Sequence, residues 1–292
     1  MLNNQNLQKY WNYLEKKYKP PVCVSKVNIL DFKKLKKEID SKNIFFIKNI
    51  IRKMYINGEA FILRNASKKN LKEKIVKLAK HYDKKQKSSF HKMYDGAPNF
   101  HRIIDKSITK KYSLYAIKHS YFFYNWNIKT KLEKEFKNGV YYHWRYIKLL
   151  AGNNKYQYEK NIPSQNQIDR LQIVNYPNGG GELRDHVDPR KNQRVVSGLI
   201  MSKKGIDFDS GGFFFRNKKN KKINIEDKLE IGDSVVFYGS IVHGVEAVDI
   251  NKKLDWKSYK GRWFIGMFVN DSDHVAKRIT ARDLTGSINT KF

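Results

Sequence analysis

The fold is decided by the stretch Leu171-Gln-Ile-Val-Asn-Tyr-Pro-Asn-Gly-Gly-Gly-Glu-Leu-Arg-Asp-His-Val-Asp-Pro189. Its first residues read as a β-strand, which breaks at Pro177 and the glycines 179–181 before an extended pattern resumes. Alternate side chains on a strand point to the same face, so His186 and Asp188 are expected to project together. An imidazole and a carboxylate placed in this way can occupy two adjacent positions around one metal ion.

A third candidate ligand, His243, follows 57 residues after His186, in Gly239-Ser-Ile-Val-His-Gly-Val245. Two histidines and one carboxylate form the facial triad of non-haem Fe(II) oxygenases, which leaves other positions on the metal open. A His-x-Asp pair occurs by chance in many turns, so the ordered pieces around it matter more. These are turns at Ser210-Gly211-Gly212 and Gly232-Asp233, each before a strand, and a last strand that opens with Arg262.

These pieces, together with Tyr176-Pro177 before the glycine-rich turn, resemble the catalytic core of Fe(II)/2-oxoglutarate-dependent oxygenases, in the prolyl-4-hydroxylase-like branch. The resemblance runs from about residue 171 to residue 273, about a third of the chain. It implies a double-stranded β-helix (jelly roll) and an oxidation of a substrate C–H bond, usually a hydroxylation, coupled to decarboxylation of 2-oxoglutarate to succinate. The implied cofactors are Fe(II), 2-oxoglutarate and O2.

Carried over residue by residue, the resemblance implies that His186, Asp188 and His243 bind the iron. Arg262 would pair with the distal carboxylate of 2-oxoglutarate, and Tyr176 would hydrogen-bond the same cosubstrate.

The sequence around Arg262 agrees with an anion-binding role. Alternation in the last strand places Arg262 on the same face as Phe264 and Phe268, where a buried guanidinium needs an anionic partner. A guanidinium also offers a planar, bidentate fork for a carboxylate. Arg262 follows His243 by 19 positions, which exceeds the usual spacing of this branch and predicts a hydrophilic loop inserted between two strands. Arg194 is the second candidate for the anchor.

Composition limits the other function classes. The chain has 292 residues, a single cysteine and a formal net charge of +31. One cysteine allows no intramolecular disulfide, and the sequence shows neither an apolar run of membrane-spanning length nor a signal-peptide core, which predicts a cytoplasmic protein. The lysines are dispersed, which predicts a solvated surface and not nucleic-acid binding, although a positive field can attract an acidic substrate.

Periodicity predicts an α+β chain with a mainly β core, buttressed on one sheet by N-terminal helices. Residues 1–165 are expected to form an N-terminal helical and β region that packs on a catalytic core of residues 166–292, as one continuous unit. Helices are predicted over residues 6–19, 31–39, 70–84 and 130–150, strands over 22–30, 43–51, 59–64 and 113–126, and a loop over 86–104. Polar residues near the predicted site are the candidates for substrate selection: Arg184, Arg190, Arg194, His101 and Arg102.

Several substrates and one other class of function stay open. A small molecule is expected first, because the chain shows no module that reads peptides or nucleotides. A protein side chain such as proline is the next candidate, and nucleic-acid demethylation would require salt-dependent oligonucleotide binding. A jelly roll that only binds a sugar or a partner is the alternative outside catalysis. The oligomeric state is left open.

Overall fold

The structure is a computed structural model that describes residues 4–285. Residues 1–3 and 286–292, at the ends of the predicted N-terminal region and catalytic core, lie outside the described residues. The helices are α1 (Asn4–Lys17), α2 (Phe32–Asp40), α3 (Ile44–Tyr55), α4 (Leu71–Lys85) and α5 (Lys131–Leu150). The strands are β1 (Lys26–Asp31), β2 (Glu59–Arg64), β3 (Phe100–Ile104), β4 (Ala116–Tyr124), β5 (Gln167–Tyr176), β6 (Gly181–Val187), β7 (Val195–Ile200), β8 (Gly212–Arg216), β9 (Lys222–Asn224), β10 (Ser234–Tyr238), β11 (His243–Val248), β12 (Arg262–Asp271) and β13 (Arg282–Asp283).

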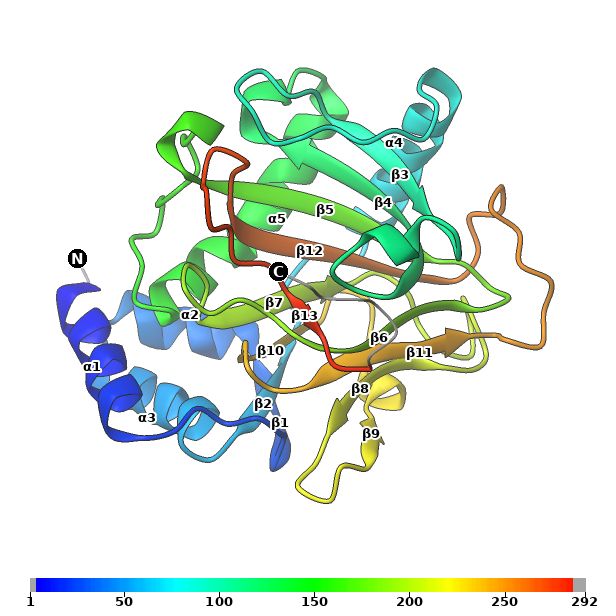
Figure 1. Cartoon of the computed structure of the whole chain (residues 1–292). Helices are drawn as coiled ribbons and strands as arrows, with labels where there is room; N and C mark the ends of the chain where they lie inside the picture. Colours follow the sequence, from blue (N-terminus) through cyan, green and yellow to red (C-terminus); the bar gives the residue numbers. More distant parts are fainter. Residues whose placement is uncertain (1–3, 286–292) are drawn as a thin grey trace.

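Strands β5 to β12 form two facing antiparallel layers (Figure 1). The first layer, here the major sheet, has the order β10-β7-β12-β5, and the second, the minor sheet, has the order β6-β11-β8-β9. From β5 to β12, consecutive strands lie alternately in the major and the minor sheet, except that β8 and β9 both lie in the minor sheet. This arrangement is the double-stranded β-helix, or jelly roll, and it confirms the predicted fold class.

The N-terminal half extends the major sheet at both edges. At one edge β2 pairs with β10 and β1 pairs with β2, and at the other β4 pairs with β5 and β3 pairs with β4. Strand β4 belongs to both layers, because its first residues, Ala116 and Ile117, pair with β6 of the minor sheet.

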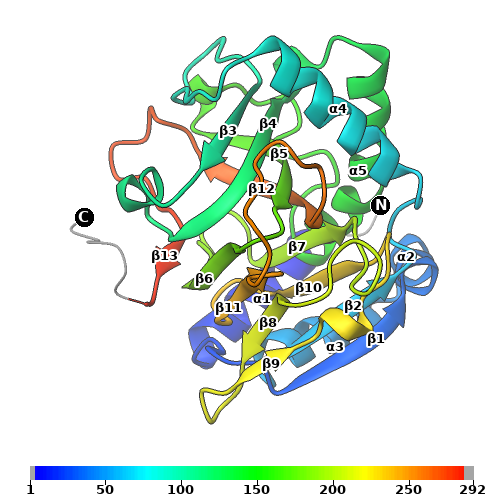
Figure 2. The ribbon, with the colours of Figure 1, turned by 90° about the vertical axis from the view of Figure 1, so that its right-hand side faces the viewer.

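The helices cover the outer face of the major sheet (Figure 2). Leu171 and Ile173 of β5 belong to a large apolar cluster that includes Trp11 of α1 and Trp144 of α5. Their neighbour Val174 points the other way and packs with Val245 of the minor sheet. Alternation along β5 therefore separates a helix-covered outer face from an inner face between the two sheets, and the inner face is where a ligand site can form.

Two predictions for the N-terminal half were wrong. The predicted strand over residues 43–51 is instead the N-cap and first part of helix α3, because Ile47, Ile50, Ile51 and Met54 recur at helical spacing and are buried together. Asn43 caps this helix by accepting the N–H of Phe46 at 3.1 Å. The predicted loop over 86–104 ends in strand β3, which pairs with β4. In the described part of the chain no helix is long and apolar enough to cross a membrane.

Candidate metal centre

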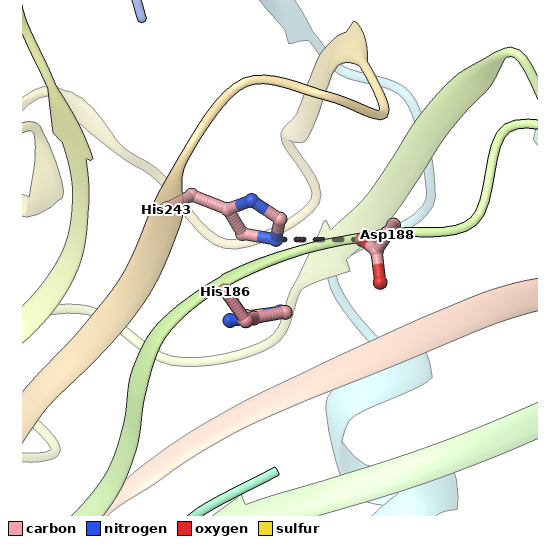
Figure 3. A group of neighbouring side chains, drawn as sticks. All are labelled: His186, Asp188 and His243. Atoms are coloured by element: carbon pink, nitrogen blue, oxygen red, sulfur yellow. Dashed lines mark ion pairs between the residues drawn. The ribbon is translucent and has the colours of Figure 1, made fainter. Parts of the chain in front are cut away.

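Strands β6 and β11 bring His186, Asp188 and His243 together at one end of the minor sheet. His186 and His243 are paired directly across the two strands, and their ring centroids lie 4.1 Å apart. Asp188 follows β6 and is held by its N–H, which donates to the carbonyl of Gly239 at 2.9 Å. The three side chains point toward one another (Figure 3), and one ligand atom from each lies within 4.8 Å of the others.

Backbone carbonyls fix the orientation of both imidazoles. Nδ1 of His186 donates to the carbonyl of Arg184 at 2.8 Å, and Nδ1 of His243 donates to that of Ile241 at 2.9 Å. Each ring therefore carries its proton on Nδ1 and keeps the lone pair of Nε2 for a ligand. Nε2 of His243 lies 3.4 Å from Oδ2 of Asp188, so the free nitrogen faces the carboxylate.

The charge states also suit a divalent metal. Burial lowers the pKa of His186 to about 4, with a smaller contribution from His243, so the imidazole is neutral near pH 7. Burial alone would raise the pKa of Asp188, but His243 and His186 outweigh it and the net shift is downward. Metal ligands must be deprotonated, so the neutral imidazole of His186 and the carboxylate of Asp188 fit a metal such as Fe(II).

Arg262 lies on the inner face of the major sheet, directly across from Tyr176 of β5. The guanidinium carbon of Arg262 is 5.9 Å from the centroid of the Tyr176 ring, and both residues are 1% exposed. Burial raises the pKa of Tyr176, so the phenol stays protonated and able to donate. The sequence resemblance assigns both residues to 2-oxoglutarate, and in the structure they lie next to each other on paired strands.

Arg262 has an internal partner that the sequence did not reveal. Its Nε donates to Oε2 of Glu226 at 2.9 Å, and both side chains are 1% exposed. Nη2 of Arg262 is buried without a hydrogen-bond partner in the described structure, as is Oε1 of Glu226. An arginine with an unpaired buried N–H group fits an incoming carboxylate, so Arg262 can bind the distal end of 2-oxoglutarate while Glu226 holds its other edge.

The Ser-Gly-Gly turn makes room for Glu226. A Cβ on Gly212 would lie 2.6 to 2.8 Å from Cγ, Cβ and Oε2 of Glu226, and Gly212 has a φ of +109°, which favours glycine. The N–H of the next residue, Phe213, donates to Oε2 of Glu226 at 2.6 Å. A single glutamate in a polar turn carries no signal of this role, because the contact depends on packing between distant strands.

Two of the predicted substrate-selecting arginines contact other residues, and a third is exposed. Arg194 forms a bidentate ion pair with Glu15 of α1, with a contact of 2.9 Å, which excludes it as the alternative anchor for 2-oxoglutarate. Arg190 is exposed. Arg184 stacks on Tyr115 with its guanidinium carbon 3.6 Å from the ring centroid.

The other two candidates lie on β3, at the edge of the major sheet. His101 is 4% exposed, and its Nδ1 lies 3.2 Å from Oδ1 of Asp83. Arg102 lies between two rings, with its guanidinium carbon 4.5 Å from the centroid of Phe90 and 4.4 Å from that of Tyr112. Their role in selecting the substrate stays a prediction.

No family model matches the chain, and no curated protein matches it. Several solved structures are similar to the chain. One is a full-length Neurospora crassa protein in complex with alpha-KG and 5-formyluracil. The two chains are 12% identical, with a TM-score of 0.49, and the match covers 91% of this chain and 89% of that chain. A Pseudomonas putida prolyl-4-hydroxylase is similar at 12% identity and a TM-score of 0.45, with 72% and 91% covered. A Trichoplax adhaerens prolyl hydroxylase, solved with a peptide fragment of the hypoxia inducible factor oxygen degradation domain, is similar at 11% identity and a TM-score of 0.45, with 83% and 94% covered.

These similarities are too low to define the fold by themselves, and the strand pairing of this chain defines it directly. The chain is a double-stranded β-helix that brings two buried histidines and a half-buried aspartate together at the three positions that the sequence resemblance implied for the iron ligands.

Proposed function

We propose that this chain is an Fe(II)- and 2-oxoglutarate-dependent oxygenase that hydroxylates a C–H bond of a small-molecule substrate. The observation that carries the proposal is the triad of His186, Asp188 and His243. Both histidines are tied through Nδ1 to backbone carbonyls, and the three ligand atoms lie within 4.8 Å of one another. A surface cluster of chance origin has no reason to have both histidines buried with their tautomers fixed.

The chain's own residues position the reactants. His186, Asp188 and His243 hold the iron, which when bound supplies the O2 chemistry that oxidises the substrate as 2-oxoglutarate becomes succinate and CO2. Arg262 holds the distal carboxylate of the cosubstrate, and Tyr176 hydrogen-bonds the same molecule.

Aromatic rings exclude water beside the metal ligands. The ring of Phe237 lies 4.6 Å from that of His243 and the ring of Phe213 lies 5.7 Å from it, measured between centroids. These rings leave His243 only 4% exposed. The walls of the site near β11 are therefore dry, which strengthens the electrostatic contacts within it.

The test is anaerobic reconstitution with Fe(II) and 2-oxoglutarate, followed by exposure to O2. We expect a weak visible charge-transfer band before O2 is added and succinate after it. His186→Ala is expected to abolish both signals. His81→Ala, which removes an exposed histidine of α4, is the matched control and should keep both.

A protein that shows neither the band nor succinate, while folded, would contradict the oxygenase and favour a jelly roll that only binds a ligand. A screen of pooled metabolites and peptides for stimulated succinate release then separates a small-molecule substrate from a protein side chain.

A further inference from the structure

A row of polar side chains crosses the inner face of the major sheet, where apolar residues would be expected. Lys118 and Ser120 of β4 alternate with outward residues, as do Arg170 and Gln172 of β5. Ser120 pairs across from Val174, which packs against the minor sheet, so this row faces the space between the sheets. Nε2 of Gln172 donates to Oγ of Ser120 at 3.0 Å, which satisfies the two neutral members. The two cations remain.

Arg170 has aromatic neighbours but no counter-ion in contact. Its guanidinium carbon lies 5.0 Å from the centroid of the Phe122 ring and 5.9 Å from that of Phe268. Its Nε is buried without a hydrogen-bond partner, and among the described residues the guanidinium forms no hydrogen bond or ion pair. The carboxylate of Asp273 acts on it electrostatically, but that carboxylate is bound to Arg278 at 2.8 Å.

Lys118 provides a second cation at the other end of the row: His119 pairs with Asn175 and Tyr124 with Arg170, so the backbone of Lys118 lies beside Tyr176 and only its long side chain brings its charge within range of Arg170. The positive charge of Lys118 acts on both His186 and Asp188, and Lys118 and Arg170 repel each other. Within the described chain its amino group also has no hydrogen bond or ion pair. Asp188 is the carboxylate that acts on Lys118, and in the proposed enzyme that carboxylate is committed to the metal.

Arg170 lies too far from Arg262 to serve the same end of one ligand. Arg262 is across from Tyr176, whereas Arg170 is across from Phe268, six residues further along the paired strands. At about 3.3 Å per residue, the two backbone positions are roughly 20 Å apart. The cosubstrate arginine and Arg170 therefore mark different ends of the space between the sheets.

We propose that the substrate is a small organic anion, whose carboxylate or phosphate binds Arg170, with Lys118 adding positive charge along the same row, while the C–H bond to be oxidised faces the triad. This inference rests on the proposed function. Two half-buried cations without a counter-ion are costly unless an anion binds beside them. The planar guanidinium, flanked by Phe122 and Phe268, keeps an edge for two oxygen atoms of the ligand, and the rings provide apolar contact for its carbon skeleton.

The test is calorimetric titration of the metal-free, full-length protein with phenylacetate, phenyl phosphate and the neutral phenylacetamide. We expect at least one anion to bind and the amide not to bind, and the two anions tell whether the site prefers a carboxylate or a phosphate. Loss of charge-assisted hydrogen bonds should weaken the anion about 10- to 100-fold in Arg170→Met. Lys118→Met should also weaken it, which keeps the test informative if one variant fails to fold by circular dichroism.

Arg216→Met is the matched control, because Arg216 also stacks on a phenylalanine but pairs with Asp185 at 2.6 Å. It should bind the anion as the unmodified protein does. The proposal is overturned if neither anion binds at millimolar concentration, if the amide binds as tightly as the anions, or if Arg170→Met and Lys118→Met both bind unchanged. It is also overturned if 2-oxoglutarate displaces phenylacetate and Arg170→Met weakens 2-oxoglutarate, since the site would then serve the cosubstrate.

The two proposals fail differently. Anion binding that depends on Arg170, in a protein that never yields succinate, would keep the anion site and refute the oxygenase. Succinate release that neutral compounds stimulate, with no anion bound, would keep the oxygenase and refute the anionic substrate.

Discussion

Glu226→Gln should make 2-oxoglutarate bind more tightly while it makes the free protein less stable. The substitution keeps the shape of the side chain and an oxygen for the N–H of Phe213, but it removes the negative charge beside Arg262. In the unmodified protein, a bound 2-oxoglutarate would put a second carboxylate on a guanidinium that Glu226 already neutralises. In the variant, the cosubstrate would be the counter-ion of Arg262.

The size of the effect follows from the geometry. Two carboxylates on one guanidinium would be about 5 Å apart, and at an effective dielectric constant of about 20 their repulsion is about 3 kcal/mol. The guanidinium between them screens part of this, so we expect an affinity gain of about tenfold, or about 1.4 kcal/mol. Without ligand, Arg262 would be a buried charge with no partner, and its side chain is 1% exposed, so unfolding should become easier by about 3–5 kcal/mol.

The assay is an anaerobic titration of the Mn(II)-loaded protein with 2-oxoglutarate, together with urea unfolding in its presence and absence. Glu230→Gln is the control, because its ion pair with Lys203 is half-exposed and should change stability by less than about 1 kcal/mol. A Glu226→Gln protein that binds 2-oxoglutarate more weakly, or equally well, would refute the reasoning. Glu226 would then orient Arg262, or Arg262 would not bind the cosubstrate.

Two further predictions concern stability. His143 is fully buried, which lowers its pKa to about 3. Its ordinary pKa is about 6.5, so the unfolded chain binds the proton first and stability falls as the pH drops below about 6.5. Between pH 7.5 and 5.5 this residue should lower the free energy of unfolding by about 1.4 kcal/mol. Urea unfolding of His143→Asn should therefore depend less on pH than that of the unmodified protein. An unchanged pH dependence would contradict the lowered pKa of His143. Gly212→Ala should cost more than about 2 kcal/mol and weaken 2-oxoglutarate, because the added Cβ meets Glu226 at 2.6 Å; full stability with unchanged affinity would count against the Glu226–Arg262 arrangement.

The site was predictable from the sequence where spacing alone fixes geometry. His186 and Asp188 share a strand face by alternation, and an ordered set of turns and strands brings His243 and Arg262 to the same barrel. Contacts between residues on strands far apart in the sequence could not be predicted from spacing in this way. Alternation puts Arg170 on the same face as Val174, but it is the folded chain that turns this face toward the minor sheet and leaves Nε of Arg170 buried without a partner.

The same distinction explains the errors. Residues 43–51 contain a short apolar run that fits either a strand or a buried helix, and the helix is decided by apolar residues further along, up to Met54. Arg194 looked available because it is close to His186 in sequence, but helix α1 supplies Glu15 from 179 residues away. Charge pairing across such separations is a property of the fold and not of the local pattern.

The most direct test of the account is diffraction from crystals grown anaerobically with Fe(II), with data collected on both sides of the iron absorption edge. The account predicts one anomalous peak within coordination distance of Nε2 of His186, Nε2 of His243 and a carboxylate oxygen of Asp188. An empty triad in fully loaded crystals, or iron bound only elsewhere on the chain, would contradict it.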